Sequence, residues 1–157
     1  MDVSAADLVG HGFLQGMADQ HLAALATCGA GYRSYAEGEF IFREGASADE
    51  FHLIEHGLVS LGTTAADRRS LVMVTLEGGE VLGWSWMFPP YRWYFDARAV
   101  AATRTIALNG ALVRAACESD PQLGYELTRR IARVVIERLQ ATRLHALDLY
   151  NTHPPRK

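Results

Sequence analysis

Residues 37–45 read EGEFIFREG, and this stretch decides the fold. Its centre, residues 40–43, has the length and apolar character of a short β-strand, and glycines at positions 38 and 45 lie on either side of it. Glycine tolerates the positive φ angles that tight turns between strands require. A short strand enclosed by glycine turns is typical of a β-sandwich or β-roll, so this stretch predicts such a fold.

The same pattern continues through the middle of the chain. Eight segments show it: residues 32–36, 40–43, 50–56, 58–63, 70–76, 81–83, 93–100 and 104–108. Helical periodicity lies on both sides, over 7–28 before the strands and over 111–118 and 121–150 after them. Asp19 and Asp120 are expected to cap helices, and Pro121 suits a first helical position.

The length of 157 residues suits one domain, and we predict an α+β fold over residues 1–157. Its centre is an antiparallel, jelly-roll-like β-roll of about eight strands in residues 31–108, flanked by N-terminal helices and a long C-terminal helix. The N-terminal helices fall in residues 1–30 and the C-terminal helices in residues 109–150. Residues 151–157 are expected to form a tail.

The composition excludes several classes of protein. Hydrophobic residues make up 49% and charged residues 21%, which argues against disorder, and the net charge of −3 argues against binding nucleic acid through bulk charge. Neither a secretion signal nor a run of about 20 apolar residues is visible, so we expect a cytoplasmic protein without a membrane span. Cys28 and Cys117 are too few for a disulfide framework or a four-thiolate cluster and are expected to be small buried residues. We expect no cofactor.

Residues 52–56 read HLIEH and match a zinc-binding pattern that requires a helix. This segment is predicted to be a strand, on which His52 and His56 would lie about 13 Å apart. One zinc ion cannot bridge that distance. We therefore expect no metal site and predict exposed histidines beside a turn.

Aromatic residues are concentrated in one segment. Seven of the fifteen lie in residues 84–95, including all three tryptophans, Trp84, Trp86 and Trp93. A protein core normally distributes its large rings along the chain. Residues 84–95, called the aromatic segment below, are therefore the first candidate for a functional region.

The order of these elements resembles the cyclic nucleotide-binding domain, the sensor half of bacterial regulators such as the catabolite activator protein. Residues 38–45 are similar to the family's strand and turn, G-E-x-I-x-R-E-G. Asp49, Ile54, Gly57 and Val59 follow at the family's spacing, and residues 76–83, LEGGEVLG, resemble L-x-P-G-D-x-F-G. The resemblance covers about residues 12–150. It implies a ligand-binding regulator, and we expect no enzyme activity and no catalytic residue.

The resemblance places the family's phosphate-binding cassette at the aromatic segment. In the family, a Gly-Glu pair opens a short helix, the glutamate binds the ribose, and an arginine about ten residues after the glycine pairs with the cyclic phosphate. Here Gly83 is followed by Trp84 and Ser85, and Arg92 falls one residue early. Because the ribose acceptor is missing, tight binding of cAMP is disfavoured.

Strand alternation bears on Arg92. On a strand through this segment, Arg92, Tyr94, Asp96 and Arg98 would share one face, so that Asp96 would neutralise Arg92 or Arg98. Arg92 is nevertheless the expected contact for any anionic group. The three tryptophans would line or plug the pocket. The complete set of ligand-binding candidates is Gly83, Trp84, Ser85, Trp86, Arg92, Trp93 and Tyr94.

Three interpretations of the cassette stay open. The first is a different ligand, apolar or aromatic, stacked on the tryptophans. The second is a cyclic nucleotide, cAMP or cGMP, bound weakly through Arg92. The third is a ligand-free roll, filled by aromatic rings, that serves as a protein-interaction module.

The long helix carries two stripes. One is suited to packing on the roll and comprises Leu123, Leu127, Ile131 and Val134. The other repeats at spacings of three and four and comprises Ala132, Val135, Leu139, Thr142, Ala146 and Leu149, which predicts a homodimer through residues 121–150. Only seven residues follow Tyr150, so we expect no helix-turn-helix and no direct DNA binding. These features together predict a stand-alone small-molecule sensor that signals to a partner protein.

Overall fold

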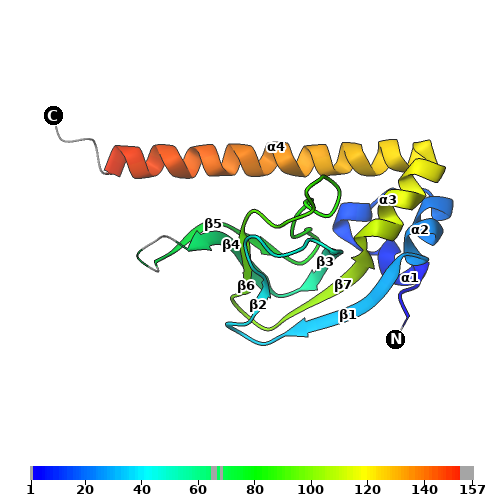
Figure 1. Ribbon diagram of the computed structural model, residues 1–157, viewed down its shortest axis with the longest axis horizontal. Coiled ribbons are helices and arrows are strands. Elements are labelled where there is room, and N and C mark those ends of the chain that lie inside the picture. Colours follow the sequence, from blue (N-terminus) through cyan, green and yellow to red (C-terminus); the bar gives the residue numbers. More distant parts are fainter. Residues whose placement is uncertain (1, 65–66, 68, 153–157) are drawn as a thin grey trace.

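The computed structural model describes residues 2–64, 67 and 69–152 (Figure 1). It has the predicted α+β architecture, with N-terminal helices, an antiparallel roll and a long final helix. The helical elements are α1 (Ala5–Val9), the 3-10 helix η1 (Gly12–Leu14), α2 (Asp19–Ala26), α3 (Gly110–Ser119) and α4 (Pro121–Thr152). The strands are β1 (Gly29–Tyr35), β2 (Phe40–Phe42), β3 (Glu50–His56), β4 (Leu58–Thr64), β5 (Ser70–Glu77), β6 (Asp96–Ala99) and β7 (Thr103–Asn109).

The strands form two antiparallel sheets, one in the order β1-β7-β3 and the other in the order β2-β6-β4-β5. Within the described residues there are seven strands, one fewer than the eight segments predicted. Residues 81–83 contribute only an isolated bridge between Val81 and Leu53. The predicted strand over 93–100 is shortened to β6, because residues 93–95 do not join either sheet.

The main core lies between the three-stranded sheet and the helices. Phe51, Ile106 and Leu108 from the sheet are fully buried and belong to one hydrophobic cluster with side chains from α2 and α4. The predicted packing stripe of α4 is confirmed, with Leu123, Leu127 and Ile131 buried and Val134 half-buried. A second, smaller cluster fills the inside of the four-stranded sheet and comprises Ile54, Val59, Leu61, Leu76, Leu82 and Ala97.

The ends of the helices show which capping predictions were right. The carboxylate of Asp120 accepts hydrogen bonds from the backbone N–H groups of Gln122 (3.1 Å) and Leu123 (3.4 Å), and Pro121 is the first residue of α4, as predicted. The prediction for Asp19 was wrong, because the chain enters α2 one residue earlier: Ala18 is the N-cap, and it makes no side-chain capping bond. Helix α4 continues through Thr152, and the remainder of the predicted tail, 153–157, lies outside the described residues.

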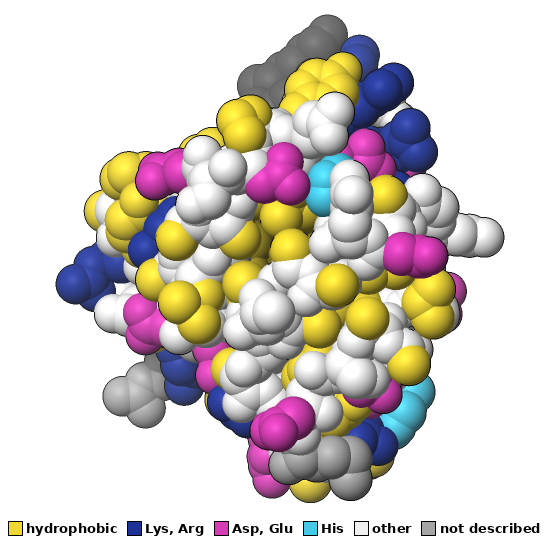
Figure 2. Space-filling view, turned by 90° about the vertical axis from the view of Figure 1, so that its right-hand side faces the viewer, with side chains coloured by type: hydrophobic (Ala, Val, Ile, Leu, Met, Phe, Trp, Pro, Cys, Tyr) yellow, Lys and Arg dark blue, Asp and Glu magenta, His cyan; other side chains and the backbone are white. Residues whose placement is uncertain are grey.

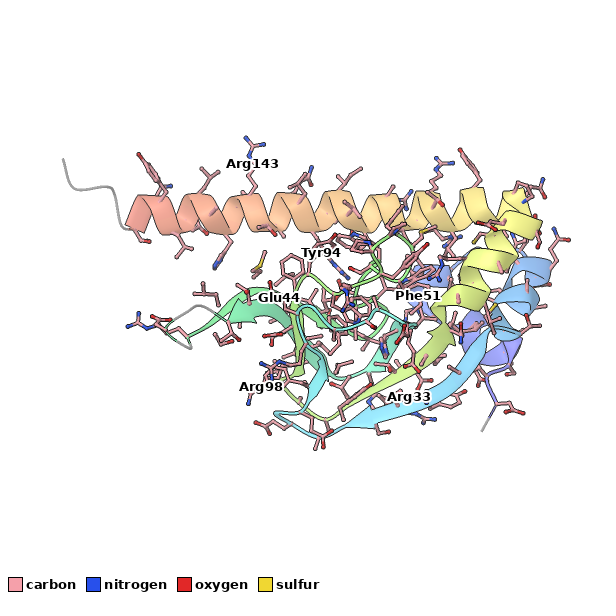
Figure 3. All side chains as sticks on the ribbon, in the orientation of Figure 1. Arg33, Glu44, Phe51, Tyr94, Arg98 and Arg143 are labelled. Atoms are coloured by element: carbon pink, nitrogen blue, oxygen red, sulfur yellow. The ribbon has the colours of Figure 1, made fainter. Side chains whose placement is uncertain are left out.

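Helix α4 runs along one side of the roll and projects past the core toward the β4–β5 hairpin (Figure 1). Val135 and Thr142 of the predicted heptad stripe are half-buried and face the roll. Arg143, one residue further along, points away from the roll (Figure 3). The exposed stripe is therefore rotated by about one residue and comprises Ala132, Ile136, Leu139, Arg143, Ala146 and Tyr150.

The two histidines of residues 52–56 and the two cysteines differ in how deeply they are buried. His52 is buried in β3, so the prediction of an exposed turn histidine was wrong for it, whereas His56 is exposed. Cys28 is buried as expected, and Cys117 is half-buried.

On the end of the molecule formed by α1, α2 and α3, hydrophobic, acidic and basic side chains are interspersed (Figure 2). None of the helices in the described part of the chain is both long and apolar enough to cross a membrane.

Candidate functional site

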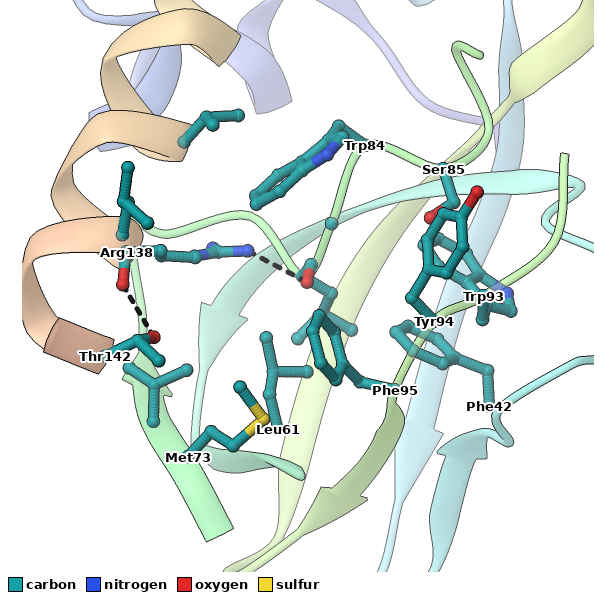
Figure 4. A pocket seen from close by; sticks show the side chains of 15 residues that line it. Phe42, Leu61, Met73, Trp84, Ser85, Trp93, Tyr94, Phe95, Arg138 and Thr142 are labelled. Atoms are coloured by element: carbon teal, nitrogen blue, oxygen red, sulfur yellow. Dashed lines mark hydrogen bonds between the residues drawn. The ribbon is translucent and has the colours of Figure 1, made fainter. Parts of the chain in front are cut away.

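A pocket of about 310 Å³ lies between the two ends of the aromatic segment, the four-stranded sheet and α4 (Figure 4). Its lining is almost entirely apolar and is drawn from segments far apart in the sequence. The lining residues are Phe42, Leu61, Met73, Val74, Leu82, Gly83, Trp84, Ser85, Trp93, Tyr94, Phe95, Val135, Arg138, Leu139 and Thr142. Five of the seven predicted ligand-binding residues are among them; Trp86 and Arg92 are not.

One wall of the pocket is a stacked pair of rings. Trp93 and Phe42 lie almost parallel, with ring centroids 3.8 Å apart and planes inclined by 7°. Gly83 packs directly against the Trp93 ring, because a Cβ atom built there would be 2.9 Å from Cζ3 of Trp93. The close approach explains why this position requires glycine.

Trp86 belongs to the core rather than to the pocket. It is fully buried and stacks on Phe51, with ring centroids 4.5 Å apart. Its indole Nε1–H donates to the Gly83 carbonyl at 3.1 Å, which satisfies the polar end of the ring. Trp86 therefore anchors the aromatic segment in the core.

The rest of the aromatic segment is tied to the turn that follows β2. The backbone N–H of Gly45 donates to the Trp93 carbonyl (2.7 Å), and that of Trp93 donates to the Ala46 carbonyl (3.0 Å). Arg92 is exposed, and its Nη1 donates to the Gly45 carbonyl at 2.9 Å. At the position of the family's cassette helix there is a turn, closed by a hydrogen bond from the Met87 N–H to the Trp84 carbonyl (2.9 Å).

Asp96 does not neutralise Arg92 or Arg98, so that prediction was wrong. The buried carboxylate accepts from the Glu44 N–H (2.7 Å), the Thr64 hydroxyl (3.1 Å) and Nε of Arg43 (3.3 Å). Burial works to raise the pKa of Asp96, but the hydrogen bonds from Glu44 and Thr64 and the nearby Arg43 outweigh it and lower the pKa. For Arg92 the alternation failed because β6 begins only at Asp96. Arg98 does lie in β6, but its Nε donates to the Gly38 carbonyl instead (2.9 Å).

The charged group in the pocket is Arg138, which sequence reasoning missed. It extends from α4 into the space between Trp84 and Phe95, and its Cζ atom lies 5.4 Å from the Trp84 ring centroid (Figure 4). Nη1 donates to the Leu82 carbonyl at 3.0 Å, and Nη2 donates to the Val81 carbonyl. Burial lowers the pKa of Arg138 to about 10, so the guanidinium remains a cation at neutral pH.

A sequence signal for Arg138 did exist. It lies three residues after Val135 and four before Thr142, which places all three on one side of the helix. Once that side is known to face the roll, an arginine among its apolar residues is conspicuous. The signal is missed because the heptad pattern was assigned to a partner helix instead.

Comparison with known proteins agrees with this architecture. Residues 32–120 match the family model of the cyclic nucleotide-binding domain. A crystal structure described as a cyclic nucleotide-binding protein of Geobacter metallireducens is similar with a TM-score of 0.76 and 28% identity, covering 87% of this chain and 98% of that one. No curated protein matches the sequence.

Two bacterial regulators share the fold. The c-di-GMP-responsive global regulator CLP of Xanthomonas campestris has a TM-score of 0.73 at 18% identity, over 84% of this chain and 64% of that one. The catabolite activator protein of Thermus thermophilus has a TM-score of 0.67 at 24% identity, over 89% of this chain and 63% of that one. The chain thus spans somewhat less than two thirds of each regulator's length.

Proposed function

The chain belongs to the cyclic nucleotide-binding domain family, and from this we propose that it is a small-molecule sensor and regulatory protein without enzyme activity. One observation carries the proposal. The aromatic segment, which takes the place of the family's cassette, leaves a pocket of about 310 Å³ that α4 helps to line. A ligand in this pocket would contact both the roll and the helix, which is what a sensor requires in order to pass on a signal.

The pocket favours a ligand other than a standard cyclic nucleotide. Trp84 stands where the family's glutamate binds ribose, and Arg92 is exposed and hydrogen-bonded to Gly45 outside the pocket lining. The stacked Trp93–Phe42 pair offers a flat apolar wall instead. We therefore propose an apolar or aromatic ligand; weak binding of a cyclic nucleotide through Arg92 would require that side chain to leave Gly45.

Intrinsic fluorescence tests this proposal, because all three tryptophans lie in the aromatic segment and Trp84 and Trp93 line the pocket. We expect cAMP and cGMP to leave the emission unchanged at micromolar concentration and a member of an aromatic metabolite panel to shift it. Thr142→Phe, which fills the pocket, should abolish the shift, whereas the control Gln140→Phe on the exposed side of α4 should keep it. If no compound changes the emission and native mass spectrometry finds no bound mass, the chain is a ligand-free interaction module.

We further propose that α4 forms the homodimer and passes the signal to a partner protein. The support is the exposed stripe on this helix, where Ile136 is 56% and Tyr150 60% exposed. Large apolar side chains in heptad register on a free helix face are typical of helix–helix interfaces. Light scattering should give a dimer mass, and Ile136→Glu should give a monomer. The control Leu144→Glu, at a 63% exposed residue off the stripe, should remain dimeric; a monomeric parent protein would refute the dimer.

A further inference from the structure

Arg138 is the one charged side chain among the described residues that line the pocket. Other arginines pair with carboxylates, among them Arg33 with Glu50, Arg43 with Asp96, Arg104 with Glu55, and Arg130 with Glu126. Three more donate to backbone carbonyls but lie outside the pocket lining, namely Arg92, Arg98 and Arg114. Across the part of the chain that the structure covers, Arg138 forms no such ion pair. Its hydrogen bonds go to two backbone carbonyls, those of Val81 and Leu82.

This arrangement leaves a partly buried guanidinium with no carboxylate in ion-pair contact, although Glu80 and Glu137 are near enough to attract it. A guanidinium carries five N–H donors in a planar fork that matches a carboxylate. The carbonyls of Val81 and Leu82 occupy one donor on each Nη atom. A partly buried charge is stabilised most when an anion joins it in the same environment. Arg138 is therefore suited to bind an anionic group that a ligand brings in.

The surroundings of Arg138 define the rest of the ligand. The guanidinium lies beside the Trp84 ring, with Phe95 on its other side and the side chains of Leu61 and Met73 beyond (Figure 4). Sugar hydroxyls would find few partners on such a lining, whereas an aromatic ring would be well accommodated. The volume of about 310 Å³ is at the lower end of the range for ligand pockets, which suits a molecule of one or two rings.

We infer that the ligand is an aromatic carboxylate, a small ring compound with one negative charge, and that its carboxylate pairs with Arg138. This inference rests on the proposed function, since it names the ligand class of the same pocket. It also differs from the sequence-based expectation, in which Arg92 would contact an anionic group.

The experiment compares 2-naphthoate with 2-naphthamide, which has the same shape and no charge, by isothermal titration calorimetry at pH 7. We expect the acid to bind at least tenfold more tightly than the amide, because the charged pair forms only with the acid. Arg138→Met should weaken binding of the acid at least tenfold and leave binding of the amide within threefold. The matched control Arg133→Met, at an exposed arginine of the same helix outside both the pocket lining and the exposed stripe, should change neither affinity.

Arg138→Lys keeps the charge and guards against a variant that merely loosens α4, so it should retain a preference for the acid. Equal affinity for acid and amide, or an unchanged affinity of Arg138→Met for the acid, would overturn the inference and leave the sensor proposal intact. If neither naphthyl compound binds and the compounds that shift the tryptophan emission carry no carboxylate, the inference also fails and the sensor proposal stands. If no compound binds at all, the inference and the proposed function fail together.

Discussion

Replacing Trp93 by alanine tests whether the aromatic segment is held in place by its own rings. Trp93 is 5% exposed, stacks on Phe42 at 3.8 Å and contacts Gly83. Removing a buried tryptophan side chain costs about 3–5 kcal/mol of unfolding free energy. For a domain of this size, that loss lowers Tm by about 6–20 °C.

Trp84→Ala is the matched control, because Trp84 lies in the same segment but is only half-buried and its ring contacts the guanidinium of Arg138. We expect it to cost about 1–2 kcal/mol, since less surface leaves the protein interior. Urea unfolding followed by far-UV circular dichroism measures both variants without depending on tryptophan emission, and an unchanged m-value validates the comparison. If Trp93→Ala costs no more than Trp84→Ala, the rings do not stabilise the segment and our reasoning is refuted.

Three further substitutions test the framework around the pocket. Asp96→Ala should cost about 2–3 kcal/mol in urea unfolding, because the Glu44 N–H loses its buried acceptor; a loss below about 1 kcal/mol would contradict that role. Gly57→Ala should cost about 1–3 kcal/mol, because Gly57 has φ +117° and a Cβ atom there would lie 2.6 Å from Cα of Thr103; an unchanged Tm would argue against this turn. Burial lowers the pKa of His52 to about 4, so the folded state resists protonation and stability is full above about pH 6.5 and falls toward pH 4. Between pH 7 and pH 5 the unfolding free energy should fall by about 2 kcal/mol, and the same pH dependence in His52→Gln would exclude this histidine as its source.

The features predicted correctly from the sequence depend on neighbours along the chain. Gly38 and Gly45 bound a strand, and Asp120 with Pro121 begins a helix, because each signal acts within one turn. The location of the candidate site was also predictable, since the aromatic segment is conspicuous in the sequence. Five of its seven candidate residues line the pocket.

The features that were missed depend on contacts between distant segments. Asp96 and its backbone partner Glu44 are 52 residues apart, and Arg138 and Leu82 are 56 residues apart. A strand prediction over 93–100 could not include the hydrogen bonds that tie Trp93 to the 45–46 turn. The helix stripe has a similar cause: with 3.6 residues per turn, Val135 and Ile136 fit an apolar stripe equally well, and only docking on the roll decides which of them is exposed.

Arg138 ties α4 to the roll through hydrogen bonds to the Val81 and Leu82 carbonyls. From there to Thr152, fourteen residues of helix extend for about 21 Å, at about 1.5 Å per residue. Because of this length, a small rotation of α4 about the guanidinium becomes a larger displacement at the end of the helix. A tilt of about 5° at Arg138 would displace Thr152 by about 2 Å, given that length. A ligand that moves the guanidinium away from Leu82 would therefore convert a small movement at the pocket into a larger movement at the end of the helix.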